Sequence, residues 1–149
     1  MIWKPHVTVA AVIENNDRFL LVEEQIDGTT VFNQPAGHLE QGESLLDAVK
    51  REVLEETACP FHPEALLGTY LYKLTKKQCS FLRFCFSGNV DEPTAGRSLD
   101  KEIIATHWLT LDQIQAQNSR LRSPMVLQCI NDYLQGTRLP LTCLHDLEA

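Results

Sequence analysis

The sequence predicts an α+β or α/β fold in which helices pack on a mixed β-sheet. β-Branched and alternating apolar segments, typical of strands, occupy most of the chain, and amphipathic helical patterns interrupt them once early and twice late. A length of 149 residues, of which 44% are hydrophobic, is also the usual size of one globular domain with its own core. We therefore expect a single domain over residues 1–149.

The first part of the chain predicts three strands. Residues 6–13 are β-branched and alternate in polarity, and an apolar run at 19–22 follows a turn signal at 15–17. We expect these two segments to form a hairpin. Another short strand at 31–34 ends at the turn residues 35–37.

The later part predicts further strands and then two helices. Two longer strands at 65–74 and 79–90 are joined by a polar turn at 75–78, and another strand covers 103–109. Helices are expected at 111–117 and 124–135, the second with Ser123 as N-cap, Pro124 at its first position and Gly136 beyond its end. We expect Trp3 and Trp108 to lie in the core.

The composition excludes several classes of partner. A net charge of -7 and a pI near 5.1 argue against a nucleic-acid polymer, which clustered Lys and Arg would bind. No apolar run reaches the roughly 20 residues needed to span a bilayer, and the N-terminal residues form no secretory segment. Five cysteines without a CxxC pair favour reduced, packed thiols over a disulfide framework. We expect a cytoplasmic protein, monomeric or homodimeric, with neither a nucleic-acid polymer nor a membrane as its partner.

The early helix, predicted over residues 44–57, concentrates the acidic charge. Residues 40–56 contain six acidic and two basic side chains, a net of -4 out of -7. At about 100° per residue, Glu52, Glu55 and Glu56 fall within one third of the helix circumference. Like charges at such spacing destabilise a helix by roughly 0.2–0.5 kcal/mol per pair, and a divalent cation such as Mg²⁺ would offset this repulsion. The alternative is a solvated surface neutralised by its own basic residues.

The segment at residues 37–59, GHLEQGESLLDAVKREVLEETAC, closely resembles the signature of the Nudix hydrolase family. The matching positions are Gly37, Glu43, Arg51, Glu52, Val53, Glu55 and Glu56. One position departs, because Ala58 stands where the family has a second glycine. Forcing alanine into a left-handed conformation at the helix end costs on the order of 1 kcal/mol, unless the helix ends by another geometry before Pro60.

The resemblance implies an α/β/α sandwich around a mixed β-sheet and a metal-dependent hydrolase of diphosphate linkages. The implied metal ligands are Glu52 and Glu56, Glu55 as a further ligand or base, the backbone carbonyl of Ala36, and Glu102 from a distant loop. Glu102 is preferred there over Asp100, and an ordinary loop carboxylate is the alternative. The cofactor is expected to be Mg²⁺, with Mn²⁺ also possible.

The resemblance also implies supporting roles around the helix. Glu43 and Arg51 are expected to pair and to brace the preceding loop against the helix. Gly37, which lacks a Cβ, would let the loop backbone approach the ion.

Four segments outside this signature resemble the NudJ-type subgroup of bacterial Nudix phosphatases: KPHVTVA at 4–10, FNQPAGHLE at 32–40, FLRF at 81–84 and LRSP at 121–124. This resemblance implies activity on nucleoside tri- and diphosphates and on thiamine-pathway pyrophosphates such as hydroxymethylpyrimidine pyrophosphate, with stepwise release of orthophosphate. Alternatives are a Nudix enzyme for dinucleoside polyphosphates, ADP-ribose or an oxidised nucleotide, and a non-catalytic nucleotide-binding module.

Five residues are candidates for substrate binding. Arg83 and Arg122 offer planar forks for phosphate oxygens, and Phe32, Gln34 and His38 border a loop where a base could stack. Each has an ordinary structural alternative: a salt bridge for Arg83, helix capping for Arg122 and a loop hydrogen bond for His38.

Overall fold

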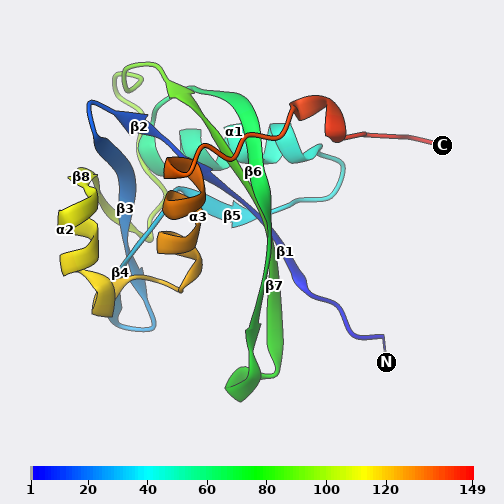
Figure 1. Cartoon of the computed structure of the whole chain (residues 1–149), viewed down its shortest axis with the longest axis horizontal. Coiled ribbons are helices and arrows are strands. Elements are labelled where there is room, and N and C mark those ends of the chain that lie inside the picture. The colour runs from blue at the N-terminus through cyan, green and yellow to red at the C-terminus, as the bar shows by residue number, and fades with distance from the viewer. Residues whose placement is uncertain (1) are drawn as a thin grey trace.

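The computed structural model describes residues 2–149, and strands form most of its regular structure (Figure 1). The strands are β1 (His6–Val12), β2 (Glu14–Asn15), β3 (Arg18–Ile26), β4 (Thr29–Asn33), β5 (Ala36–His38), β6 (Phe61–Leu74), β7 (Cys79–Val90) and β8 (Ile103–Thr110). The helices are α1 (Leu45–Thr57), α2 (Leu111–Ala116) and α3 (Met125–Leu134), with 3₁₀ turns at Thr75–Lys77, Asn118–Arg120 and Leu141–Cys143.

The strands form two sheets of four strands each. The first has the order β5-β1-β7-β6 and is mixed, because β1 and β7 run parallel while the other pairs are antiparallel. In the second, β2, β4 and β8 all pair with β3 in antiparallel fashion. The predicted mixed α+β architecture is therefore confirmed.

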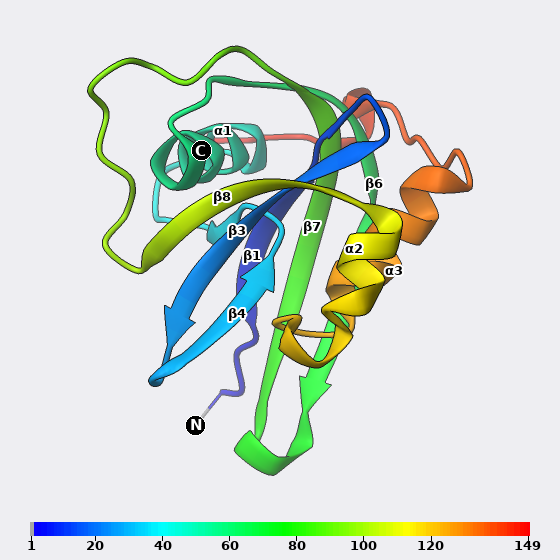
Figure 2. The same cartoon turned by 90° about the vertical axis from the view of Figure 1, so that its left-hand side faces the viewer.

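Helices cover both sides of the strands, as Figure 2 shows, with α1 on one side and α2 and α3 on the other. The alternation of β1 produces this arrangement, because successive side chains of a strand point to opposite faces. Val9 and Ala11 join the cluster that packs against Val49 of α1. Ala10 packs in the other cluster with Ile130 of α3. The layers therefore correspond to the expected α/β/α sandwich.

The predicted hairpin between residues 6–13 and 19–22 was wrong. β1 pairs with β5 and β7, whereas β3 belongs to the other sheet. The tight hairpin is instead β2 with β3, whose turn residues Asn16 and Asp17 both have positive φ, 50° and 60°. The apolar alternation predicted the strands correctly, but it does not specify where the chain passes from one sheet to the other.

Several strand boundaries also differ from the prediction; β3, for example, extends to Ile26 where an end at 22 was expected. The segment Ala36–His38 forms the short strand β5 against β1, where a turn was expected. Strand β6 begins at Phe61, four residues before the predicted 65, because Pro63 is accommodated at a register shift in its pairing with β7.

Helix α1 has the start and end that its sequence requires. The Ser44 hydroxyl accepts a hydrogen bond from the Asp47 amide at 3.1 Å, which is a standard N-cap. At the other end Ala58 adopts the left-handed conformation, with φ 63° and ψ 5°, and its amide donates to the Leu54 carbonyl at 2.9 Å. Alanine thus takes the geometry of the family's glycine, at a strain of about 1 kcal/mol.

The structure corrects three smaller expectations. Helix α3 begins at Met125 with Pro124 as its cap residue, although the Ser123 hydroxyl still accepts from the Met125 amide at 3.2 Å. Trp3 and Trp108 are not core residues, since they are 63% and 37% exposed. Trp3 precedes β1, and Trp108 lies on β8, which pairs only with β3 in the described part of the chain. Among residues 2–149, no helix is long and apolar enough to cross a membrane.

Candidate metal-binding active site

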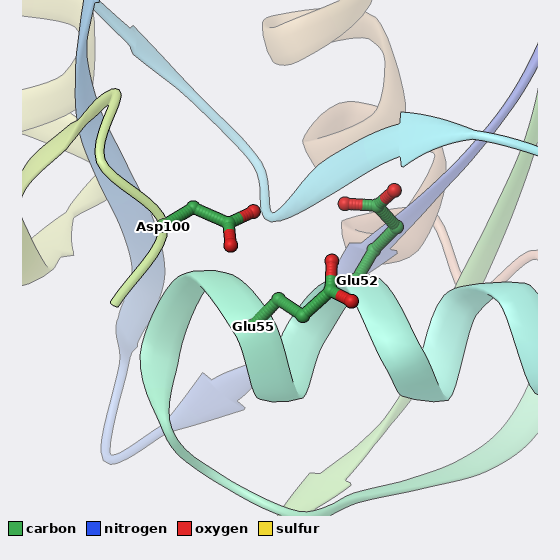
Figure 3. A group of neighbouring side chains, drawn as sticks. All are labelled: Glu52, Glu55 and Asp100. Atoms are coloured by element: carbon green, nitrogen blue, oxygen red, sulfur yellow. The ribbon is translucent and has the colours of Figure 1, made fainter. Parts of the chain in front are cut away.

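Three carboxylates converge beside α1, as Figure 3 shows. Glu52 and Glu55 project from the helix, and Asp100 comes from the loop before β8. One ligand oxygen from each residue lies within 4.8 Å of the other two. The loop is held in place because the Asp100 amide donates to the Glu55 backbone carbonyl at 3.0 Å. This group has the all-oxygen character that hard divalent cations prefer.

Glu56 points from α1 toward strand β5. Its Oε1 accepts a hydrogen bond from the Ala36 amide at 2.8 Å, and the residue is 7% exposed. Burial raises the pKa of Glu56 to about 9, and the nearby Glu24, Glu52 and Asp100 carboxylates add to the increase. Burial also raises the pKa of Glu52. Negative charge is therefore concentrated here beyond what the protein itself compensates.

Arg51 is the cation at the centre of the acidic helix. Its guanidinium donates two hydrogen bonds to the Glu43 carboxylate, from Nη2 to Oε1 at 2.7 Å and from Nε to Oε2 at 3.0 Å. Its Nη1 donates to Glu52 at 2.8 Å and to Glu55 at 3.2 Å, and Nη2 also donates to the His38 carbonyl at 3.0 Å. The hydrogen bonds from Arg51 lower the pKa of Glu43. Arg51 thus ties β5 and the loop after it to α1.

Gly37 lies directly against the Glu52 carboxylate. A Cβ at Gly37 would collide with the carboxylate carbon and both oxygens of Glu52. The glycine is therefore needed for space, because β5 passes too close to the acidic side chain for any other residue.

Glu52 and Glu56 open onto a cavity of about 800 Å³. Its acidic end is lined by Glu24, Glu52, Glu56 and Glu102, together with Ala36 and Gly37. Tyr72 and Phe81 from β6 and β7 and Ile26 and Val31 from β3 and β4 also line the cavity, together with the polar Asp27, Thr29 and Lys77 at the tips of these two hairpins. The cavity volume falls in the range of small-molecule sites.

The structure separates the residues that were predicted to bind substrate. His38, Arg83 and Arg122 line the cavity. Phe32 does not, because its ring lies in the core and Arg120 stacks on it with 4.7 Å between the guanidinium carbon and the ring centroid. Gln34 is fully buried and also lies behind the cavity wall.

Gln34 instead helps to hold the Arg83 guanidinium in place through a hydrogen bond. Its Oε1 accepts from Arg83 Nη1 at 2.9 Å, while its own amide donates to the Val126 carbonyl at 2.7 Å. Arg83 Nη2 donates to Asn33 Oδ1 at 3.1 Å. Arg83 therefore does not form the salt bridge that was its alternative interpretation.

Sequence reasoning missed Glu24 and ranked Asp100 below Glu102 as the loop ligand. Asp100 joins Glu52 and Glu55, whereas Glu102 lines the cavity without belonging to that group. Glu24 of β3 faces the same cavity, and burial raises its pKa although a hydrogen bond from the Asn33 side chain opposes the shift. The sequence gives no clear signal for Glu24, because it lies among other polar residues in the second half of β3, beside Glu23 and Gln25.

The residues present fit a divalent cation. The donors are carboxylate oxygens, Gly37 makes room for the Glu52 carboxylate itself, and burial together with the neighbouring carboxylates raises the pKa of Glu56, an effect that a bound cation would oppose. Arg51 is the one basic side chain that pairs with these helix carboxylates in residues 2–149. A sandwich fold with such a carboxylate group beside an open cavity is the arrangement expected of a hydrolase that holds a divalent cation.

Comparison with known proteins identifies the class. The family model described as NUDIX domain matches residues 4–128, so the chain belongs to the Nudix hydrolase family. It is a hydrolase acting on phosphorus-containing acid anhydrides, and enzymes of this family generally use divalent metals. The resemblance seen in the signature segment is confirmed.

Individual relatives narrow the comparison to a subgroup of the family. Phosphatase NudJ of Escherichia coli K12 is 38% identical over 144 residues, which cover 97% of this chain and 93% of that protein. The structure of a Nudix hydrolase from Nitrosomonas europaea has a TM-score of 0.94 and 49% identity, covering 97% of this chain and 98% of that one. The Nudix domain of Shewanella oneidensis NrtR, solved with ADP-ribose, has a TM-score of 0.74 at 19% identity, over 91% and 90%. The NudJ-type resemblance is therefore confirmed, while the third match supports the fold.

Proposed function

We propose that this protein is a Mg²⁺-dependent phosphatase of nucleoside tri- and diphosphates and of small pyrophosphates such as hydroxymethylpyrimidine pyrophosphate, and that it releases orthophosphate. One observation carries the proposal: a single cavity is lined both by the carboxylates of Glu52, Glu56, Glu24 and Glu102 and by the aromatic side chains of Tyr72 and Phe81. Phosphates would bind near the carboxylates and an organic group on the aromatic side chains. The relationship to phosphatase NudJ supports the same substrate class.

Several residues would hold the cation. Glu52 is central because it belongs to the group with Glu55 and Asp100 and also lines the cavity beside Glu56. Ala36 would contribute its backbone carbonyl, as the family resemblance implies. Bound Mg²⁺ would neutralise phosphate oxygens and lower the pKa of a bound water, and Mn²⁺ offers similar chemistry.

The chain's own residues would orient and deprotonate the attacking water. The water oxygen forms a new bond to phosphorus, the bridging P–O bond breaks, and the leaving group keeps the electron pair. A carboxylate oxygen takes the water proton, and Glu55 is suited to this because it is the most exposed of the three helix glutamates. Arg51 keeps Glu55 in place through its 3.2 Å hydrogen bond.

The structure gives no support to the alternative that this chain is a non-catalytic nucleotide-binding module. Ala58 was the one departure from the signature, and it takes the left-handed conformation that the glycine would supply. The carboxylates one turn earlier are present and face the site.

The location and organisation expected from the sequence remain part of this proposal. All five cysteines are free thiols, which suits a reducing compartment such as the cytoplasm. We propose that residues 1–149 act as one catalytic domain, as monomer or homodimer, without a nucleic-acid polymer as partner.

A substrate panel tests the proposed function. Nucleoside tri- and diphosphates, hydroxymethylpyrimidine pyrophosphate, ADP-ribose and a dinucleoside polyphosphate are incubated with Mg²⁺, and orthophosphate and pyrophosphate are measured separately. We expect orthophosphate from the first three, none with chelator, and a loss of turnover by orders of magnitude in Glu56→Gln with the fold retained. Predominant pyrophosphate release, or wild-type turnover in Glu56→Gln, would contradict the proposal.

A further inference from the structure

Neighbouring rows of side chains cross the first sheet on the face that carries the cavity. Directly paired residues share a face, and so do residues two positions apart on one strand. His6 pairs with Phe81 and Phe81 with Tyr72, so these three form one row. The adjacent row contains Thr8, Arg83 and Tyr70 in the same order.

The row of His6, Phe81 and Tyr72 is aromatic. The rings of His6 and Phe81 stack with centroids 5.0 Å apart and planes at 22°, and Phe81 and Tyr72 both line the cavity. Ile26 and Val31 face them across the cavity. Figure 2 shows that the β3–β4 and β6–β7 hairpins project at the same end of the molecule. Both hairpins contribute lining residues to the cavity, and we call this part of the cavity the slot between the two hairpins. A slot with an aromatic wall, facing apolar side chains and the polar Asp27, Thr29 and Lys77 at its rim, suits a flat heterocycle.

Arg83 lies between this wall and the carboxylates. It is 3% exposed and lines the cavity, yet no carboxylate of residues 2–149 lies within 4.0 Å of its guanidinium. Nη1 donates to the Gln34 amide and to Cys129 Sγ, Nη2 donates to the Asn33 amide, and Nε is buried with no hydrogen-bond partner. A buried cation that forms no salt bridge is costly, and longer-range attraction to Glu24 offsets this only in part, so an anion from the ligand would complete the arrangement.

The order of these features along the sheet matches the order of groups in a phosphorylated ring compound. Ala10, beside Ala36 of the acidic end, is four residues from His6 on β1. At roughly 3.3 Å per residue this is about 13 Å. Arg83 pairs with Thr8, midway between the two. A ring, an adjoining phosphate and a scissile phosphate would meet the three features in turn.

We propose that the slot between the two hairpins is the binding site for the planar heterocycle of the substrate, with the ring on Phe81 and Tyr72 and the adjoining phosphate on Arg83. This inference rests on the proposed function and deepens it, because it places substrate selection outside α1. It replaces Phe32, the stacking residue expected from the sequence, with Phe81 and Tyr72.

Binding measured without turnover tests the proposal. With chelator present, calorimetry compares a nucleoside, its 5′-monophosphate and orthophosphate. The wild type is expected to prefer the monophosphate to the nucleoside. Phe81→Leu and Tyr72→Leu, which keep apolar volume but remove the flat face, should weaken both ring ligands roughly 5- to 150-fold, the range of base–aromatic stacking. Leu71→Ala, on the opposite face of β6, is the matched control and should bind like the wild type.

Arg83 is tested by the difference between the two ring ligands. Arg83→Met should lose the preference for the monophosphate over the nucleoside while nucleoside binding stays within about twofold, and Arg83→Lys should restore part of the preference. Equal losses for both ligands in Arg83→Met, or unchanged ring binding in Phe81→Leu and Tyr72→Leu, would overturn the proposal. If the wild type releases no phosphate from any substrate, the proposed function fails, and the ring preference is still measured independently.

Discussion

Replacing Gly37 with alanine should inactivate the enzyme while leaving its fold in place. The added Cβ would collide with the carboxylate carbon and both oxygens of Glu52. Strand β5 cannot easily withdraw, because it pairs with β1 and because the Ala36 amide donates to Glu56 at 2.8 Å. The Glu52 side chain must therefore move, and it is the carboxylate shared by the acidic group and the cavity.

The expected magnitude follows from that displacement. Glu52 would have to shift by an ångström or more, which breaks its 2.8 Å hydrogen bond from Arg51 and moves a ligand oxygen out of position. A misplacement of about 1 Å at a reacting centre can lower turnover about 100-fold. The backbone at Gly37 is not left-handed, so alanine adds no conformational strain there, and we expect the melting temperature to fall by only a few degrees.

The assay is orthophosphate release at saturating Mg²⁺, together with thermal unfolding and a Mg²⁺ titration by calorimetry. Gly68→Ala is the matched control, because a Cβ at Gly68 meets only Tyr70 side-chain atoms at 3.6 Å or more. It should keep near wild-type turnover. Wild-type turnover and Mg²⁺ affinity in Gly37→Ala would refute the placement of Glu52 at the centre of the site.

Three further predictions concern the Arg51–Glu43 contact, the choice of loop carboxylate and the effect of Mg²⁺ on stability. Arg51→Lys loses the two-point contact with Glu43 and should destabilise the protein by about 1–3 kcal/mol in chemical unfolding; unchanged stability would mean that the contact is not structural. Asp100→Asn should weaken Mg²⁺ affinity by roughly 10–100-fold in calorimetry, and Glu102→Gln should have the smaller effect, because only Asp100 belongs to the compact group. The reverse order would restore Glu102 as the loop ligand. Mg²⁺ at 100 times its Kd should stabilise the wild type by about 2.7 kcal/mol in thermal unfolding, and Asp100→Asn should gain less at the same concentration.

The sequence predicted those parts of the fold that depend on local order. The acidic helix was placed within one residue, because apolar spacing and a serine cap specify it without reference to distant residues. Strand β7 was also predicted at its observed limits, Cys79–Val90, because a long alternating segment is bounded there by polar turns. The signature segment specified the carboxylates of α1 for the same reason, since all of them lie within a few helical turns.

The parts that were missed depend on contacts between distant segments. Strand β5 is three residues long and contains a glycine, so it has no periodicity and exists only because β1 is beside it. Asp100 reaches α1 through a backbone hydrogen bond to Glu55, which no pattern within the loop announces. Phe32 was chosen for its nearness to the signature in sequence, yet the alternation of β4 turns its ring into the core.

The proposed ring site lies apart from the carboxylates, and a physical reason favours this separation. The carboxylates must be held rigidly. On α1 this is achieved by the hydrogen bond from Arg51 to Glu52 and by the close packing of Gly37, in strand β5, against the Glu52 carboxylate. A ring of variable size needs walls that can differ without disturbing that packing. The hairpins β3–β4 and β6–β7 meet this need, because their ends project beyond the helices that cover the sheets. Arg83 connects the two regions, since it is buried by core residues while its charge is left for the ligand to neutralise. Changes at Phe81 and Tyr72 should therefore alter which substrate is bound, whereas changes at Glu52 should abolish hydrolysis of every substrate.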